Sequence, residues 1–253
     1  MIGVFDSGVG GLSALLPLCK RMPRQSFWYY ADTAALPLGE KTPRAVLARI
    51  KKALAFFEEK GAEAVLFACG TASSCLTSRL RAAVSFPIYD IISPVCAKVK
   101  QGGREKTTVL LGTSYTVKNG TFACALARSQ PLFSLACPDF VPMAEGILPR
   151  TRERFVKTLS PLFPIHPHRI VLGCTHFSWL KKEIARTMPR ATLIDAAACA
   201  AEAVARGAPH WAKAPCASTP YMRFAVTKDQ YGFYKRCRQI TGLPLSEDQF
   251  LLV

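Results

Sequence analysis

One strand–turn–helix pattern occurs twice in this chain, and this repeat constrains the fold more than any other feature. The apolar run 65–68 leads into Cys69 and a turn of small residues, and the run 170–172 leads in the same way into Cys174. A second matching pair, at residues 2–7 and 109–114, has nearly the same separation. The repeat predicts two related halves whose strand ends face each other across a cleft, so that the two cysteines flank one small ligand.

Strands alternate with helices along the rest of the chain, with few hairpin signals. This order predicts an α/β fold with two pseudo-symmetric domains, each a mostly parallel sheet flanked by helices, and the active site in the cleft between them. The expected domains are 1–97 plus 208–253, which carries Cys69, and 98–207, which carries Cys174.

Turn and capping residues set the expected element bounds. The expected strands are 2–5, 26–30, 65–68, 87–89, 109–112, 132–136, 170–172, 191–195 and, as the last one, 220–226. Helices are expected at 43–60, 91–100, 117–128, 151–162 and 228–241, with further ones starting at residue 12, after each of the two cysteine turns and in the Ala-rich stretch that ends at residue 206. The segment 101–106 is the clearest linker, and 138–146 is expected to be a loop that carries Glu145.

Composition excludes several classes of protein. Half of the 253 residues are hydrophobic, so the chain can bury a core and is not expected to be disordered. No apolar run approaches the roughly 20 residues that span a bilayer, and the start of the chain lacks a signal-peptide pattern. We therefore expect a cytoplasmic protein with no membrane partner.

The net charge of +16 would suit an anionic partner. The basic residues, however, are spread over many expected helices, without a basic tail or interleaved aromatic residues. A solvated basic surface is the expected interpretation, and nonspecific contact with nucleic acid is the alternative.

The ten cysteines show neither a Cys-x-x-Cys pair nor zinc-site spacing. Eight of them are expected to be mostly buried core residues: Cys19, Cys75, Cys96, Cys124, Cys137, Cys199, Cys216 and Cys237. Cys69 and Cys174 differ, because each lies between a strand and a helix, where the helix N-terminus favours a thiolate. Two such thiols on opposite faces of a carbon acid could invert a stereocentre, one removing a proton while the other delivers one.

The first turn, 6–11, is rich in glycine and could bring backbone N–H groups close to a ligand. Its pattern is not Gly-x-Gly-x-x-Gly, so dinucleotide binding is not expected. Asp6 could serve the chemistry or simply cap the following helix.

Together, four motifs resemble the glutamate racemases, cofactor-independent enzymes that make D-glutamate for the bacterial cell wall. They are 3–11 (GVFDSGVGG), 32–39 (DTAALPLG), 68–72 (ACGTA) and 173–177 (GCTHF), and the likeness covers nearly the whole chain. The chain has a histidine after Cys-Thr and resembles the glutamate enzymes in this, whereas aspartate racemases usually carry Glu at this position. The resemblance implies the substrate glutamate, a role in peptidoglycan synthesis and cell shape, and no PLP, metal or other cofactor. Relatives often form homodimers, although no interface signal appears in this sequence.

The resemblance also implies roles for individual residues. Cys69 and Cys174 would exchange protons with the substrate, with Asp6 near the first cysteine and His176 and Glu145 near the second. The residues implied in substrate binding are Asp6, Ser7, Leu38, Gly39, Gly70, Thr71, Thr113, Thr116, Thr175 and His176. Taken alone, His176 could be a structural histidine and Glu145 a solvated loop acid.

Two positions depart from the pattern. Gly70 replaces an Asn that contacts the bound amino acid, and Leu38 replaces a Tyr beside the distal carboxylate. The acid–base pair is kept, so the alternatives to a glutamate racemase are a racemase or epimerase of another amino acid, and a non-catalytic relative that binds an anion or nucleic acid. A cysteine hydrolase is not expected, because neither cysteine has a separate base and orienting residue beyond His176.

Overall fold

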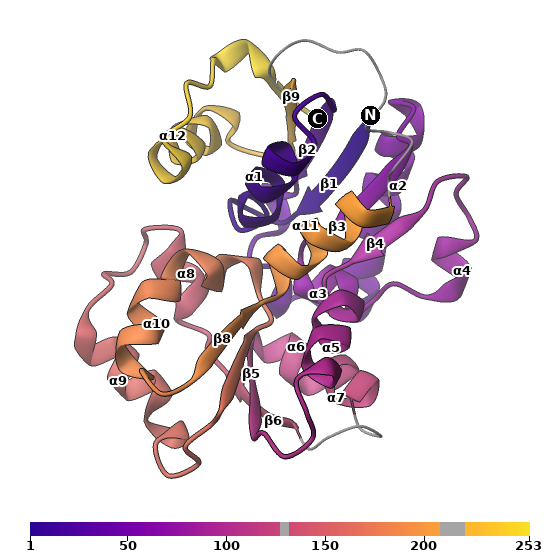
Figure 1. Ribbon diagram of the computed structural model, residues 1–253. Helices are drawn as coiled ribbons and strands as arrows, with labels where there is room; N and C mark the ends of the chain where they lie inside the picture. Colours follow the sequence, from indigo (N-terminus) through magenta and orange to yellow (C-terminus); the bar gives the residue numbers. More distant parts are fainter. Residues whose placement is uncertain (127–131, 208–220) are drawn as a thin grey trace.

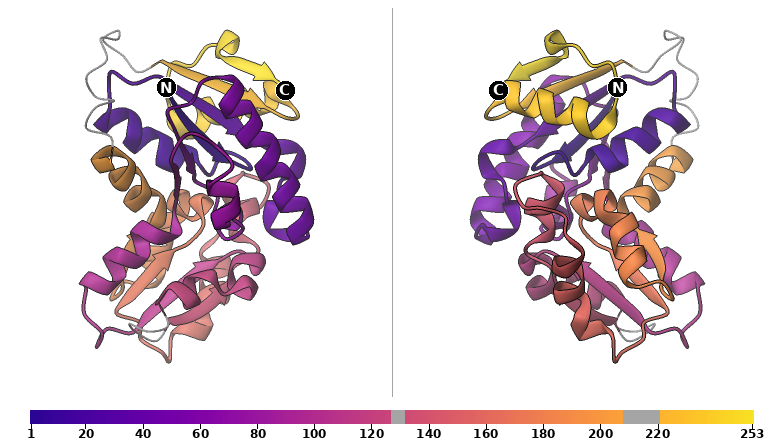
Figure 2. Two further views of the ribbon diagram at one scale, coloured as in Figure 1. Left: turned by 90° about the vertical axis from the view of Figure 1, so that its right-hand side faces the viewer. Right: turned by 90° about the vertical axis from the view of Figure 1, so that its left-hand side faces the viewer.

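The computed structural model describes residues 1–126, 132–207 and 221–253, and it forms two lobes, each built on a parallel sheet (Figure 1). Both ends of the chain lie in the upper lobe of Figure 1. The two further views in Figure 2 show the lobes one above the other, with helix α11 (Ala196–Gly207) beside the junction. The expected α/β class with two sheets is confirmed.

The first sheet has the strand order β10-β9-β2-β1-β3-β4 and the second has β6-β5-β7-β8. All neighbouring strands are parallel. The strands of the first sheet are β1 (Ile2–Asp6), β2 (Phe27–Ala31), β3 (Ala64–Phe67), β4 (Ile88–Asp90), β9 (Met222–Val226) and β10 (Phe250–Leu252), and those of the second are β5 (Thr108–Gly112), β6 (Leu132–Ala136), β7 (Arg169–Leu172) and β8 (Thr192–Asp195).

The strand orders reveal the internal repeat directly. The sequence β2-β1-β3-β4 in one sheet corresponds to β6-β5-β7-β8 in the other, and β9 and β10 extend only the first sheet, beyond β2. Cys69 follows β3 and Cys174 follows β7, so the two cysteines occupy equivalent places in the two lobes. The domain boundaries expected from the sequence stay a prediction.

Helices cover the sheets and join the lobes. Besides α11, they are α1 (Leu12–Arg21), α2 (Pro43–Glu59), α3 (Gly70–Ser73), α4 (Ser78–Arg81), α5 (Ile92–Gln101), α6 (Ser114–Asn119), α7 (Thr121–Leu126), α8 (Phe140–Ala144), α9 (Arg152–Leu159), α10 (Lys181–Thr187) and α12 (Gln230–Thr241), with short 3₁₀ turns that include η2 (Leu38–Glu40) and η4 (Thr175–Leu180). Helix α11 packs against α1 and α5. One apolar cluster runs from Val4 through α1 and α11 to Val171, so a continuous core connects the two lobes.

Four local expectations are wrong, each for an identifiable reason. The helix expected at 117–128 is two helices, because Gly120 adopts a left-handed conformation between α6 and α7. The expected loop 138–146 contains α8, whose apolar side chains are buried. Strand β10 follows the strand expected to be the last. Cys124 is exposed and Cys75 is only half-buried, whereas Cys19, Cys96, Cys137, Cys199 and Cys237 are buried as expected.

Three expectations reach outside the described residues: the last part of the helix 117–128, the start of the strand 220–226, and Cys216. In the part of the chain that is described, no helix is both long enough and apolar enough to cross a bilayer.

Candidate active site

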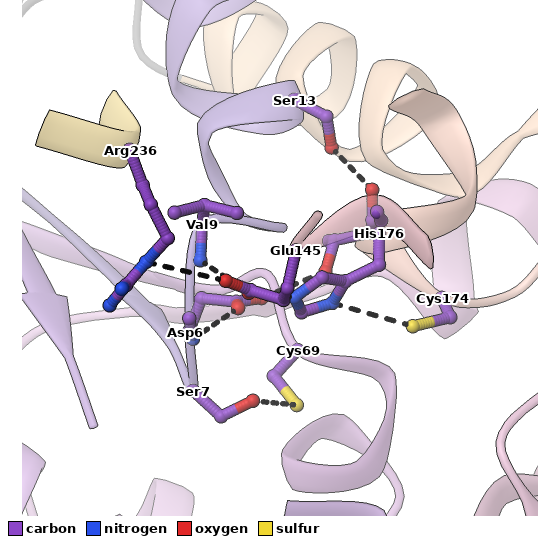
Figure 3. Close-up of polar contacts among 12 residues, drawn as sticks. Asp6, Ser7, Val9, Ser13, Cys69, Glu145, Cys174, His176 and Arg236 are labelled. Atoms are coloured by element: carbon purple, nitrogen blue, oxygen red, sulfur yellow. Dashed lines mark hydrogen bonds and ion pairs between the residues drawn. The ribbon is translucent and has the colours of Figure 1, made fainter. Parts of the chain in front are cut away.

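The turns after β1, β3, β5 and β7 converge between the two sheets and enclose one small cavity. Cys69 and Cys174 both line it, each with about 7% of its surface exposed. The other expected site residues that line it are Ser7, Leu38, Gly39, Gly70, Thr71, Thr113, Thr116, Thr175 and His176. Asp6 and Glu145 lie behind this lining, where Asp6 contacts Thr175 and Glu145 contacts His176 (Figure 3).

The cavity measures about 20 Å³, which is close to the space that a single water needs and too small for an amino acid. A second hollow of about 150 Å³ shares Leu36, Pro37, Gly39, Thr113 and Val141 with it. The shared residues come from both lobes and form a wall between the two hollows. A ligand of amino-acid size can reach the cysteines only when the wall or the lobes move.

Cys69 is a thiol in this closed arrangement. Burial raises the pKa of Cys69 well above its usual range, and the nearby Asp6 carboxylate adds to this, whereas the N–H groups of Thr71 and Ala72 lower it by less. The helix N-terminus thus acts on Cys69 in the expected direction, but in the closed site it does not offset burial.

Cys174 lies beside a basic side chain, that of His176, whereas the charged neighbour of Cys69 is the acid Asp6. The Nδ1 of His176 lies 3.8 Å from the sulfur of Cys174, and its Nε2 donates to Oε1 of Glu145 at 2.6 Å. Burial opposes a charge on His176, but hydrogen bonds to Cys174 and Glu145 outweigh it and raise the His176 pKa well above its usual value. Burial likewise opposes the Glu145 charge, yet the bond from His176 leaves its pKa lowered. Both pKa shifts favour the charged pair, an imidazolium at His176 and a carboxylate at Glu145.

The other lobe holds this pair in place. The backbone N–H of Val9 donates to Oε1 of Glu145 at 3.2 Å. Asp6 accepts the N–H of Gly8 on one oxygen and the hydroxyl of Thr175 on the other, both at 2.9 Å. Asp6 thus bridges the two lobes and holds its own turn, and α1 carries no side-chain cap. Burial raises the pKa of Asp6, while the positive His176 lowers it by less.

Gly70 is required by a close approach of the two cysteine turns. A Cβ atom at this position would lie 2.4 Å from the carbonyl oxygen of Gly173, which is closer than real Cβ contacts. An Asn at position 70 would therefore force the turns apart. Leu38 is almost fully buried and packs in the apolar cluster around α2, where a hydroxyl would have to find a partner.

Sequence reasoning missed several residues of the site. Leu36, Pro37 and Val141 line the cavity, and Arg236 of α12 lies 3.7 Å from Glu145. Pro37 belongs to a motif that the sequence already shows, whereas Arg236 is one of many dispersed basic residues and carries no local signal. Among residues 1–126, 132–207 and 221–253, no cluster of three or more His, Cys, Asp or Glu side chains forms a metal site.

Comparison with known proteins identifies the family. The profile of the Asp/Glu/hydantoin racemases matches residues 21–204. This chain belongs to that family. A glutamate racemase of Thermus thermophilus is 36% identical over 208 residues, which cover 81% of this chain and 78% of the relative, and that of Gloeobacter violaceus is 31% identical over 216 residues, which cover 83% and 81%.

Solved structures of this racemase family share the whole fold. Glutamate racemase from Thermus thermophilus in complex with beta-chloro-D-alanine superposes with a TM-score of 0.87 at 31% identity, covering 100% of this chain and 96% of that one. The RacE1 isoform from Bacillus anthracis gives a TM-score of 0.92 at 25% identity, covering 100% and 97%. The resemblance seen in the four sequence motifs is confirmed.

The contact at Gly70 predicts a change in stability whose sign is diagnostic. Gly70→Ala adds only a Cβ, and in a helix with free space this exchange would stabilise the protein by about 0.5–1 kcal/mol. Because the Cβ meets the Gly173 carbonyl, we expect the free energy of unfolding to fall by about 1–3 kcal/mol instead. Urea denaturation measures it, and an unchanged or increased stability would contradict the close approach.

Burial of Cys69 predicts its reactivity. We expect iodoacetamide to alkylate Cys69 much more slowly than the exposed Cys124, because the reagent can reach Cys69 only when the closed site opens. Peptide mass spectrometry follows each cysteine separately, and the exposed Cys124 shows that the reagent is active. A rate for Cys69 as high as that for Cys124 would contradict the closed arrangement of the site.

Proposed function

We propose that the protein is a glutamate racemase that interconverts L- and D-glutamate by proton transfer at two thiols, without a cofactor. The observation that carries this proposal is the position of Cys69 and Cys174, which come from equivalent turns of the two repeated units and line one cavity. Related proteins support the choice of substrate, since the matched relatives are named glutamate racemases.

In this mechanism one sulfur removes the α-proton of glutamate and the other delivers a proton to the opposite face. The imidazolium of His176 lies where its charge would stabilise a thiolate at Cys174, and Cys69 is held as a thiol by burial. One turnover that starts from this state moves the proton from Cys69 to the substrate and the α-proton to Cys174. The reverse reaction starts from the opposite pair of protonation states.

Hydroxyl groups from both lobes would hold the charged ends of glutamate. The hydroxyl of Thr113 lies 3.4 Å from that of Thr71 and 3.0 Å from that of Thr116, and Ser7 and Thr175 line the same cavity. These groups can reorient toward carboxylates, and positioned hydrogen bonds in a dry cleft stabilise the carbanion-like centre. The expected roles of Asp6, Gly39 and the backbone of Gly70 in binding stay proposals.

A racemase or epimerase of another amino acid is the second candidate, and the two departures favour it. Gly70 and Leu38 supply no side-chain hydrogen bond, and each bond lost to a charged ligand weakens binding by about 1.5–3 kcal/mol, roughly ten- to a hundredfold in affinity. If glutamate is the substrate, we therefore expect weak binding.

D-glutamate made by this reaction would supply peptidoglycan synthesis. A cytoplasmic location and a homodimer stay predictions, as does the absence of a nucleic-acid partner despite the net charge of +16.

Exchange of the α-hydrogen of glutamate with deuterium tests the proposal. We expect the purified protein to exchange it without added PLP or metal. Cys69→Ser and Cys174→Ser should each lower racemisation by about 10²–10⁴, the usual contribution of a general acid or base, with opposite effects on which enantiomer still exchanges. Cys124→Ser, at an exposed cysteine, is the control.

Three outcomes are decisive. Absence of exchange for both enantiomers of glutamate would contradict the main proposal, and exchange with another amino acid would then support the second candidate. Full racemisation by either active-site variant would contradict the two-thiol mechanism.

A further inference from the structure

An arginine outside all four motifs reaches the acid behind the active site. The Nε of Arg236, on α12, lies 3.7 Å from Oε2 of Glu145. Figure 3 shows its side chain extending from the C-terminal helix toward Glu145, on the side away from Cys174. Glu145 is only 3% exposed, whereas the Arg236 side chain is 32% exposed, so the arginine connects a buried carboxylate to the surface.

The two oxygens of Glu145 have different partners. Oε1 accepts both the imidazolium of His176 and the N–H of Val9, while Oε2 faces Arg236. Because α12 follows β9 of the first sheet and Glu145 follows α8 of the second lobe, the ion pair crosses between the lobes. Arg236 is therefore linked to Cys174 through Glu145 and His176.

A second observation is that the Arg236 guanidinium lies between two carboxylates, one buried and one at the surface. Within the described part of the chain, its Nε is buried without a hydrogen-bond partner, since 3.7 Å to Glu145 is an ion-pair distance and too long for a hydrogen bond. The other end of the guanidinium is held by Asp229, 3.5 Å from Nη1. Asp229 is itself fixed, because it caps α12 by accepting the N–H of Gly232.

We propose that Arg236 is a positioning residue, which keeps Glu145 an oriented carboxylate so that His176 stays charged beside Cys174 while that sulfur gains and loses its proton. This inference rests on the proposed racemase function. A buried carboxylate with one partner can rotate or take up a proton when its partner changes charge. A second cation on the free oxygen opposes both changes.

Several other ionisable groups surround Glu145 and must be considered in any pH effect. His176 and Cys174 belong to the same lobe, and Val9 contributes only a backbone N–H. The remaining groups close enough to interact electrostatically are Asp6, Tyr29, Arg236 and Cys237, with Asp229 behind the arginine. Within this set, Arg236 is the cation on α12, and it forms an ion pair with the Glu145 carboxylate.

Removal of the Arg236 charge should affect catalysis at low pH. We expect Arg236→Met to lower kcat by about tenfold, a fraction of the usual acid–base contribution, with a smaller change in KM. Loss of the cation raises the pKa of Glu145. On acidification, the variant should therefore lose activity at a higher pH than the wild type does. Arg236→Lys keeps the charge and should restore the acid side of the profile, and Arg238→Met, at an exposed arginine on the same helix, should match the wild type.

A second readout does not need activity. The ¹³C shift of the Glu145 carboxyl, assigned with Glu145→Gln, gives its titration directly, and we expect the Glu145 pKa to be higher in Arg236→Met than in Arg238→Met. If Arg236→Met does not fold, Arg236→Gln replaces it with the same expectations.

The outcomes separate this inference from the proposed function. Loss of stability, or a higher KM, with an unchanged pH profile and unchanged Glu145 titration would show that Arg236 is merely structural, and would overturn the inference. A wild type and an Arg238→Met variant that racemise no amino acid would contradict the proposed function, and the positioning role with it, whereas the titration would still report whether Arg236 sets the charge of Glu145.

Discussion

The close approach of two backbone turns is the constraint on which the rest of this structure depends. Gly70 and Gly173 flank the two cysteines, and their backbones lie so near that a Cβ at position 70 would collide with the Gly173 carbonyl. This contact brings two sulfurs from separate lobes to one cavity. Any reaction that needs groups on both sides of one carbon atom therefore depends on how firmly the lobes close, and the continuous core through α1 and α11 resists their separation.

Equivalent positions in the repeated fold have become chemically different. Cys69 has Ser7 and Asp6 nearby and is kept as a thiol by burial, whereas Cys174 has an imidazolium that is held by Glu145. The backbone supplies the symmetry, and buried charges contributed mainly by one lobe supply the asymmetry. A racemase must work in both directions, so the two environments must allow each sulfur to be acid in one direction and base in the other. The small, buried cavity makes each of these charges effective.

The sequence predicted those parts of the molecule that depend on local pattern. The apolar runs before Cys69 and Cys174 identified β3 and β7, and their repetition identified two equivalent lobes. The sequence could not predict that burial outweighs the helix N-terminus in setting the pKa of Cys69, because this burial depends on the turns that close over the sulfur from the other lobe. Only the family resemblance placed Glu145 near Cys174, since nothing local shows that it is buried against His176 after α8. Arg236 escaped notice for the same reason, because its partner is distant in sequence.

The most direct measurement is a crystal structure of the protein with glutamate bound. We expect the α-carbon to lie between the two sulfurs, with Cys69 on one face and Cys174 on the other, each at a near-attack distance of about 3–3.5 Å. We also expect the hydroxyl groups of both lobes to contact the two carboxylates. A ligand that lies with both sulfurs on one face of the α-carbon, or that binds elsewhere while the cysteines remain enclosed, would contradict the two-thiol mechanism.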